Sequence, residues 1–366
     1  MLVVLLCLAM ETTSAVHLST NETSADAQIF DLQYIIWVFV LPFVLLVGII
    51  GNIMSVIVLH SKAFRYTTTG VYLPLTAIAD TVFLLTGSLE ILDVAEVFDF
   101  REYNVWTCRV YKVVFYTAGD VSIWLLVAFT FDRFIAVCFP LKKSSVCRWK
   151  RAAIASGTIL FLALAKNFHE FWTRGPEYIK GKFYRICGTQ AQYAFFLDYV
   201  RPWIAFLLIM VIPFVLLFLL NCMIVYSLIK AQRMRSKAAA APACTATTGT
   251  GNKPQKSTAS FRQTTLMCLS ISFAFLICMA PSIVLLIGKP YWKHRSKLAY
   301  ENAKAICNLL GFVNHCINFF LYCVTGRRFR QELKAKLTCG RVEVRPTSPT
   351  SVSTQNDVTM SSVQYR

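Results

Sequence analysis

Residues 125–141 read LLVAFTFDRFIAVCFPL, an apolar run that contains two adjacent opposite charges, Asp132 and Arg133. Such a pair is costly in a hydrocarbon layer unless it faces a protein interior or lies at the membrane interface. If this run is a membrane helix, the pair therefore indicates a functional position. The composition of the rest of the chain decides whether a membrane is involved.

The composition is that of a membrane protein. The 366 residues are 56% hydrophobic and only 15% charged, with a mean hydropathy of +0.54. A soluble domain of this size carries much more charge on its surface. The 28 Phe and 15 Tyr residues also suit a lipid-facing protein with aromatic residues at the interfaces.

A spanning helix needs about 20 mostly apolar residues, and the chain has seven such stretches. We therefore expect an all-α membrane protein, a seven-transmembrane helix bundle. The fourth stretch is the weakest, because polar residues crowd its end. The expected spans are 34–60, 71–92, 108–138, 152–171, 202–229, 265–287 and 303–324.

Lys and Arg residues predict the orientation of the bundle. Residues 1–33 contain none, whereas the odd-numbered connections and the C-terminal tail hold 23 of the 37. The positive-inside rule places that side in the cytoplasm and the N-terminus outside, as in a multi-pass plasma-membrane protein. Asn21 begins an Asn-Glu-Thr glycosylation sequon on the expected outer side. The net charge of +18 follows from topology and attraction to anionic membrane lipids, without nucleic acid.

Two cysteines fall on the expected outer side, Cys108 at the start of the third span and Cys187 after the fourth. In an oxidising compartment we expect a disulfide between them. Cys339 follows a basic segment at the inner side and suits palmitoylation, with a free cytosolic thiol as the alternative.

The chain divides into three parts: an extracellular tail (1–33), the bundle (34–337) and a disordered cytoplasmic tail (338–366). Within the bundle, residues 236–260 are rich in Ala, Thr, Gly and Lys and predict a disordered cytoplasmic loop. In residues 326–337, Phe329, Leu333 and Leu337 recur every four residues between charges. This spacing predicts a short amphipathic eighth helix on the inner leaflet.

Short motifs in the seven spans occur in a fixed order. They are Gly51-Asn52, Leu75–Asp80, Cys108, Asp132-Arg133-Phe134 followed by Pro140-Leu141, Pro213, Phe275 with Cys278–Pro281, and Asn318–Tyr322 followed by Phe329. With these motifs, about residues 34–337 resemble a rhodopsin-like (class A) G-protein-coupled receptor. The resemblance implies a receptor, not an enzyme, with a heterotrimeric G protein, arrestin and receptor kinases as partners.

The resemblance gives the charged pair a role. It implies that Asp132 holds Arg133 in the inactive state, and that an outward swing of helix six frees Arg133 to receive the G protein. The residues of this coupling switch are Asp132, Arg133, Phe134, Pro140 and Tyr322. The alternative is an interfacial arginine that only reaches toward water.

Two positions depart from the family pattern. Met279 stands where the family usually has Trp in the helix-six toggle, which here comprises Phe275, Met279 and Pro281. A thioether is flexible and cannot act as the same rigid toggle. Phe319 replaces the usual Pro of helix seven, so that helix loses the steric cause of a kink.

Asp80 lies in the middle of the second span and needs polar partners at that depth. The resemblance implies an allosteric sodium ion there, and no other cofactor. The expected site residues are Asp80, Asn52, Ser122, Asn314 and Asn318. A hydrated carboxyl group without sodium, ionised or protonated, is the alternative. We interpret His169 and His315 as core or interfacial residues.

The outward half of the bundle is the expected ligand pocket. Phe115 stands where amine receptors carry Asp, and Phe312 where opsins carry Lys, which disfavours amines and retinal. Mixed charges and aromatic residues at the mouth suit a short peptide. The segment LAKNFHEFWTRGPEY (164–178) and the Asn318-Phe319 pair resemble invertebrate neuropeptide (RFamide-type) receptors and related orphan receptors. The expected pocket residues are Glu90, Asp93, Lys112, Phe115, Tyr116, Arg201, Phe206, Glu301, Lys304 and Phe312.

Three other functions compete with a signalling receptor. A transporter predicts paired intramembrane charges and repeats, and the sequence indicates one mid-bundle carboxylate and no repeat. A membrane enzyme needs a nucleophile–base pair or a metal cluster within the bundle. A non-signalling decoy receptor fits Met279 and Phe319.

Overall fold

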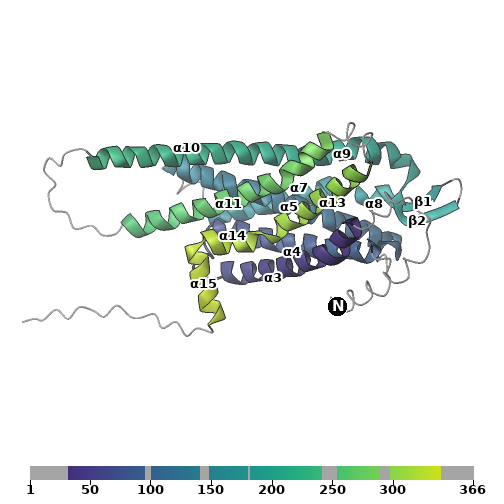
Figure 1. Ribbon diagram of the computed structural model, residues 1–366, viewed down its shortest axis with the longest axis horizontal. Coiled ribbons are helices and arrows are strands. Elements are labelled where there is room, and N and C mark those ends of the chain that lie inside the picture. The colour runs from purple at the N-terminus through teal and green to yellow at the C-terminus, as the bar shows by residue number, and fades with distance from the viewer. Residues whose placement is uncertain are drawn as a thin grey trace, which may run out of the picture.

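Long helices run along one axis of the molecule, with two short strands at one end and the helix α15 at the other (Figure 1). We refer to these as the strand end and the α15 end. The computed structural model describes residues 32–94, 100–140, 148–179, 182–240, 254–287 and 297–338. Asn21, Cys339 and the segments 1–31 and 339–366 lie outside the described residues.

The elements in chain order are η1 (Ile35–Val40), α3 (Leu41–Leu59), α4 (Thr69–Val94), η2 (Phe100–Glu102), α5 (Val105–Cys138), α7 (Trp149–Asn167), α8 (Glu170–Thr173), β1 (Arg174–Ile179), β2 (Lys182–Thr189), η3 (Ala191–Tyr193), η4 (Phe196–Val200), α9 (Arg201–Ala205), η5 (Phe206–Val211), α10 (Ile212–Ala240), α11 (Pro254–Ile287), α13 (Lys297–Cys316), α14 (Asn318–Thr325) and α15 (Arg327–Leu337).

Seven candidate spans lie at the predicted places, which confirms the predicted membrane bundle. Among the described residues, six helices are long and apolar enough to cross a membrane, and α13 with α14 forms a seventh as a bent pair. The six are Leu32–Leu59, Thr69–Leu89, Val105–Cys138, Trp149–Thr173, Phe196–Met234 and Gln263–Leu285. Among them α5 has the largest buried share, and its side chains Leu125 and Phe129 belong to the main core cluster.

Helix seven is bent although it lacks the steric cause of a kink that a proline would supply. The helix bends by 50° between Ala299–Cys316 and Asn318–Thr325, although Phe319 is not a proline. The side chain of Asn52 donates a hydrogen bond to the backbone carbonyl of His315, with a length of 3.0 Å. In an unbroken helix that carbonyl accepts from the amide of Phe319. A side chain that competes for a helix carbonyl is a recognised cause of a kink.

Small residues on α3 let this bent helix approach closely. A Cβ atom added at Gly48 would lie 2.8 Å from the Cβ of Cys316, and one added at Gly51 would lie 3.0 Å from the Cβ of Phe319. Both distances are tighter than ordinary van der Waals contact. Close backbone approach at small residues is a main source of helix association in membranes. Gly48 and Gly51 therefore seat α13 and α14 against α3.

The connection between α8 and α9 contains a β-hairpin that the sequence analysis did not predict. Strands β1 and β2 pair antiparallel, with Arg174 opposite Thr189 and Ile179 opposite Lys182. The pairing is irregular between Gly175 and Glu177, where Pro176 has no amide hydrogen to donate. The hairpin lies at the strand end, beyond the ends of the long helices (Figure 1).

The disordered loop predicted at 236–260 is wrong at both edges. Helix α10 extends to Ala240, and α11 already begins at Pro254. The edge residues 238–240 are alanines, which have the highest helix propensity and readily extend an existing helix. Proline suits the first turn of a helix. Residues 241–253 lie outside the described part.

The predicted eighth helix is α15, which turns away from the bundle axis (Figure 1). Phe329 on its apolar face is fully buried and meets the ring of Tyr322, with centroids 5.4 Å apart. Arg330 donates to the backbone carbonyls of Cys323 and Val324 at the end of α14. One face of α15 is therefore attached to the bundle, while Leu337 remains exposed.

Replacement of Gly48 by Ala should lower the free energy of unfolding by about 1–3 kcal/mol, because the added methyl overlaps Cys316. Thermal unfolding of the purified protein in detergent measures this. Gly157→Ala in α7 is the matched control, since nothing lies within 4 Å of its added Cβ. That variant should be neutral or slightly stabilised, and equal melting temperatures for both would contradict the packing argument.

Candidate functional site

The α15 end contains a buried three-residue cluster around the charged pair of the sequence. Arg133 forms an ion pair with the neighbouring Asp132, and both side chains are buried. Thr68, which directly precedes α4, donates from its Oγ1 to Asp132 Oδ2 at 2.8 Å. The same Oγ1 accepts from Arg133 Nη2 at 2.6 Å. The pair on α5 is thus fastened to the start of α4, and Thr68 is a residue that the sequence analysis missed.

Helix α11 meets α5 close to this cluster through neutral groups. Thr130 and Ser272 place their hydroxyl oxygens 3.1 Å apart, and the Cys268 thiol lies 3.5 Å from the Thr130 hydroxyl. All three side chains are buried. A neutral hydrogen bond in a protein contributes only about 1 kcal/mol net. Among the described side chains, these hydrogen bonds between α5 and α11 are therefore individually weak.

The remaining switch and toggle residues lie outside the cluster of Asp132, Arg133 and Thr68. Phe134 is half-buried, with its ring centroid 5.7 Å from that of Phe139, and Pro140 is exposed. Tyr322 is fully buried and packs on Phe329. The three toggle residues lie on α11. Phe275 and Met279 belong to the main core cluster, and Pro281 lies inside the helix. Their roles stay predictions.

Asp80 lies at the centre of a polar cluster in the middle of the bundle. Its carboxylate is fully buried, and three side chains from other helices donate to it. Ser122 Oγ and His315 Nδ1 contact Oδ1 at 2.5 and 2.7 Å, and Asn318 Nδ2 contacts Oδ2 at 2.9 Å. Because a carboxylate only accepts, Nδ1 of His315 carries the hydrogen. The cluster joins α4, α5, α13 and α14.

The expected sodium residues are only partly brought together. Ser122 and Asn318 contact Asp80 directly, whereas Asn52 bonds to the backbone of His315 and Asn314 is buried one position before it. His315 was interpreted as a core or interfacial residue, and it is the direct partner that the sequence analysis missed. Its position next to Asn314, within a turn of Asn318, was the available signal.

A sodium ion does not fit this donor set. Hard cations take oxygen ligands with free lone pairs, and here an imidazole nitrogen and an amide nitrogen point their hydrogens at Asp80. The ring of His315 is also held against Phe83, with centroids 4.2 Å apart. The side chains around Asp80 therefore satisfy it as hydrogen-bond donors.

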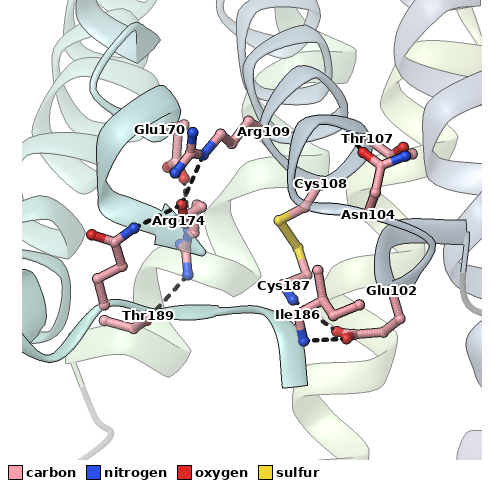
Figure 2. Close-up of a disulfide and its surroundings, with 11 residues drawn as sticks. Glu102, Asn104, Thr107, Cys108, Arg109, Glu170, Arg174, Ile186, Cys187 and Thr189 are labelled. Atoms are coloured by element: carbon pink, nitrogen blue, oxygen red, sulfur yellow. Dashed lines mark hydrogen bonds and ion pairs between the residues drawn. A yellow bond between two sulfur atoms is a disulfide. The ribbon is translucent and has the colours of Figure 1, made fainter. Parts of the chain in front are cut away.

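At the strand end a disulfide fixes the hairpin to α5, and an acidic side chain of η2 holds the same strand (Figure 2). Cys108 and Cys187 form the predicted disulfide. Beside it, Glu102 accepts from the backbone amides of Ile186 and Cys187, at 2.5 and 3.1 Å. In the chain-entropy description, a crosslink closing a loop of 79 residues stabilises by about 4–5 kcal/mol. The disulfide thus holds β2 over the strand end of the bundle.

Arg174 and Arg109 continue this fastening on the other side of the hairpin (Figure 2). Arg109 Nε donates to the backbone carbonyl of Arg174 at 3.0 Å. Arg174 itself contacts Glu170 Oε2 at 2.7 Å and the Thr189 hydroxyl at 3.2 Å. These bonds connect α5, α8 and both strands, so the hairpin has a defined position above the helices.

Two further carboxylates are buried in the spans, which corrects the single mid-bundle carboxylate of the sequence analysis. Asp120 Oδ2 contacts Lys166 Nζ and Asn167 Nδ2, each at 2.7 Å. Glu170 Oε1 contacts Arg201 Nε at 3.0 Å, in addition to Glu170's bond with Arg174. Asp120 lies on α5 within a long apolar run, and a charge at such a place was itself a signal.

Part of the expected pocket does assemble. The Arg201 guanidinium lies 4.3 Å from the ring centroid of Tyr116, and Lys112 lies 5.9 Å from the same centroid. Cations above an aromatic face are attracted to it. Phe115 and Phe312 both pack on Phe83, with centroids 4.7 and 5.5 Å away. Phe83 was missed because its contacts depend on the packing of three helices.

Other expected pocket residues are not part of this group. Phe206 packs on the exposed Trp203, with centroids 6.1 Å apart. Glu301 and Lys304 pair with each other along α13 at 3.3 Å. Glu90 and Asp93 lie on the last turns of α4, and their side chains are outside the described residues.

Comparison with known proteins decides the family. Residues 51–322 match the sequence model of the family described as 7 transmembrane receptor (rhodopsin family). The chain belongs to this family. Its similarity to individual members is lower. It is 28% identical to the FMRFamide receptor of Drosophila melanogaster over 78% of this chain and 50% of that receptor, and thus spans about half of that relative's length.

Two further members of the rhodopsin family give the same picture. The chain is 22% identical to the allatostatin-A receptor of Bombyx mori, over 81% of this chain and 78% of that one. It is 25% identical to the growth hormone secretagogue receptor type 1 of Mus musculus, over 78% and 76% of the two chains. The predicted resemblance to rhodopsin-like receptors, including invertebrate neuropeptide receptors, is confirmed.

Replacement of Lys166 by Met should destabilise this family member by about 3–5 kcal/mol, because Asp120 is left as an unpaired buried charge. The double variant Asp120→Asn with Lys166→Met removes that charge and should recover much of the loss. Thermal unfolding in detergent measures both. Lys304→Met is the matched control, since this exposed lysine pairs with Glu301 at the surface and should cost less than about 1 kcal/mol. Equal losses at Lys166 and Lys304 would contradict the prediction.

Proposed function

We propose that this protein is a cell-surface receptor that binds a short peptide at the strand end and activates a heterotrimeric G protein at the α15 end. The observation that carries the proposal is the buried cluster of Asp132, Arg133 and Thr68, placed beside a weak α5–α11 contact. Membership of the rhodopsin family supports it.

Two features support the orientation of the proposed receptor in the plasma membrane. Disulfides persist in oxidising compartments, so the end that carries Cys108–Cys187 faces the outside. The α15 end is rich in Lys and Arg, including five in α15 itself, and faces the cytoplasm. The N-terminus is then extracellular and the C-terminus cytoplasmic.

The relatives and the strand end both favour a peptide ligand. The relatives are named as receptors for FMRFamide and allatostatin-A. At the strand end, aromatic rings from α4, α5 and α13 lie beside cations that already have partners, such as Arg201 with Glu170. A ligand with both apolar rings and charged groups would engage both parts. A charged ligand would exchange ion-pair partners with these cations, which a purely apolar ligand does not do.

The proposed activation is a shift between two arrangements of the α15 end. In the arrangement seen here Arg133 is covered, because Asp132 and Thr68 occupy its guanidinium. The α11 contact through Thr130 and Ser272 is neutral and costs little to break. A ligand that binds better when α11 has moved outward shifts the population to that state. Arg133 is then available to the G protein.

Unsatisfied polar groups support the existence of a second arrangement. The amide of Asn221 on α10 and the hydroxyl of Tyr322 on α14 are buried, and neither has a hydrogen-bond partner among the described residues. An orphaned buried polar group costs about 1–3 kcal/mol. A rearrangement of α10 and α14 that satisfies these groups would recover this energy, and so would reduce the cost of opening the bundle.

Other partners follow from the same proposal. Receptor kinases and arrestin would act on the Ser- and Thr-rich tail, which lies outside the described residues, and anionic lipids would contact α15. The paired charges Asp120 and Lys166 are the feature expected of a transporter. The receptor is the better conclusion because the family match, over residues 51–322, covers most of the bundle. A decoy would bind ligand without stimulating nucleotide exchange.

Thr68→Val should raise ligand-independent nucleotide exchange about fivefold or more. It removes two hydrogen bonds to charged groups, each of which contributes more than a neutral bond. Arg133→Ala should abolish exchange at unchanged surface expression. The measurement is guanine-nucleotide exchange on purified G proteins with membranes that contain each variant.

Thr158→Val, on the exposed surface of α7, is the matched control and should behave as wild type. Nucleotide exchange is also measured with an agonist present. Agonists come from a neuropeptide library, screened in expressing cells with calcium and cyclic-AMP readouts. Full exchange activity in Arg133→Ala would refute the coupling mechanism, and peptide binding by the wild type without any exchange would identify a decoy.

Asn221→Leu should raise the melting temperature and lower ligand-independent exchange. The apolar side chain removes an unsatisfied amide from the closed arrangement and also removes the group that the open one would satisfy. Thermal unfolding and nucleotide exchange are measured on the same preparation. A higher melting temperature with undiminished exchange would mean that Asn221 has no part in opening.

A further inference from the structure

We propose that His315 takes the place beside Asp80 that a cation would take, so the mid-bundle polar cluster of this receptor is closed to sodium by the chain's own imidazole. The starting observation is the bond of 2.7 Å from Nδ1 of His315 to Oδ1 of Asp80. The proposal concerns this chain's departure from the family's sodium site, and it holds whether or not a G protein is the partner.

The donors around Asp80 leave little capacity for a metal ion. Oδ1 already accepts from two side chains, Ser122 and His315, and Oδ2 accepts from Asn318. A sodium ion would have to replace hydrogen-bond donors with oxygen lone pairs on the same side of the carboxylate. Two of the three donors are nitrogen groups, and an N–H directed at Asp80 offers no lone pair toward an ion there.

Packing keeps the imidazole in this position. His315 is only 4% exposed, and its ring lies on Phe83. Phe83 is itself held between Phe115 and Phe312. The backbone carbonyl of His315 accepts from Asn52, beside the bend of helix seven. A rotation of the imidazole away from Asp80 would therefore disturb several ring contacts at once, and close-packed interiors resist such changes.

Removal of the imidazole would leave a cluster of oxygen atoms that favours binding of an alkali cation. The Oδ1 atom of Asn52 is buried and has no partner in the described part of the chain. Without the ring, the Ser122 hydroxyl and the Asp80 carboxylate would border the vacated volume, and Asn52, which bonds to the backbone of the same residue, would bring this oxygen as a further acceptor. Those are the hard oxygen ligands that an alkali cation takes. His315→Ser adds one more hydroxyl to the set.

The test compares the thermal unfolding of detergent-purified protein in NaCl and in KCl at equal ionic strength. We expect the wild type to melt at the same temperature in both salts. His315→Ser should melt about 2 °C higher in NaCl when sodium is present at about three times its Kd. His315→Asn, which offers an amide oxygen, is measured in the same way in case the serine variant does not unfold cooperatively.

Two controls define the outcome. The double variant Asp80→Asn with His315→Ser should lose the difference between the salts, and His60→Ser, at the exposed end of α3, should match the wild type. A sodium-specific increase in the wild type that Asp80→Asn removes would overturn the proposal. So would cooperative unfolding of both His315 variants with no preference for sodium. Neither result depends on nucleotide exchange, so a failure of the proposed signalling function is distinguished from a failure here.

Discussion

A charged or polar side chain inside the bilayer must find its partners within the protein, because lipid offers none. This chain meets that constraint at several levels. Asp132 is satisfied at the α15 end, Asp80 in the middle, and Asp120 and Glu170 nearer the strand end. Each carboxylate takes partners from other elements. Since lipid tails give helices no hydrophobic reason to associate, these contacts and the close packing at small residues hold the bundle together.

The spans could be predicted from the sequence because apolar length is a local property. The bilayer fixes how many apolar residues a helix needs, and no knowledge of neighbours is required. The partners of buried charges are different. His315 reaches Asp80 across 235 residues, and the contact depends on the bend at Ile317, which cannot be read from local sequence. Thr68 was hidden for another reason, since a hydroxyl before a helix is an ordinary cap residue. Asp120 was visible in principle, as a carboxylate in an apolar run.

Phe319 shows how a local rule fails when a distant contact produces the same result. Proline kinks a helix by removing an amide hydrogen and by steric conflict with the preceding turn. Phenylalanine does neither, so the local sequence supplies no cause for a kink. The bend is present because Asn52, from another helix, bonds to the carbonyl of His315, and because Gly51 gives Phe319 room against α3. The bend is therefore a tertiary property in this chain, and it positions Asn318 and His315 on Asp80.

One residue, Phe83, connects the aromatic group at the strand end to the polar cluster around Asp80. Phe83 contacts the rings of Phe115, Phe312 and His315. A ligand that displaces Phe115 or Phe312 would therefore change the support of the imidazole directly. Contact alone does not make a coupling pathway, because the cluster must also have a second arrangement to adopt. The side-chain oxygen of Asn52, which has no partner in the described part of the chain, is an acceptor that a second arrangement could use. In this receptor the donor on Asp80 is part of the chain, so a change in ring packing would act on the cluster without the release of an ion.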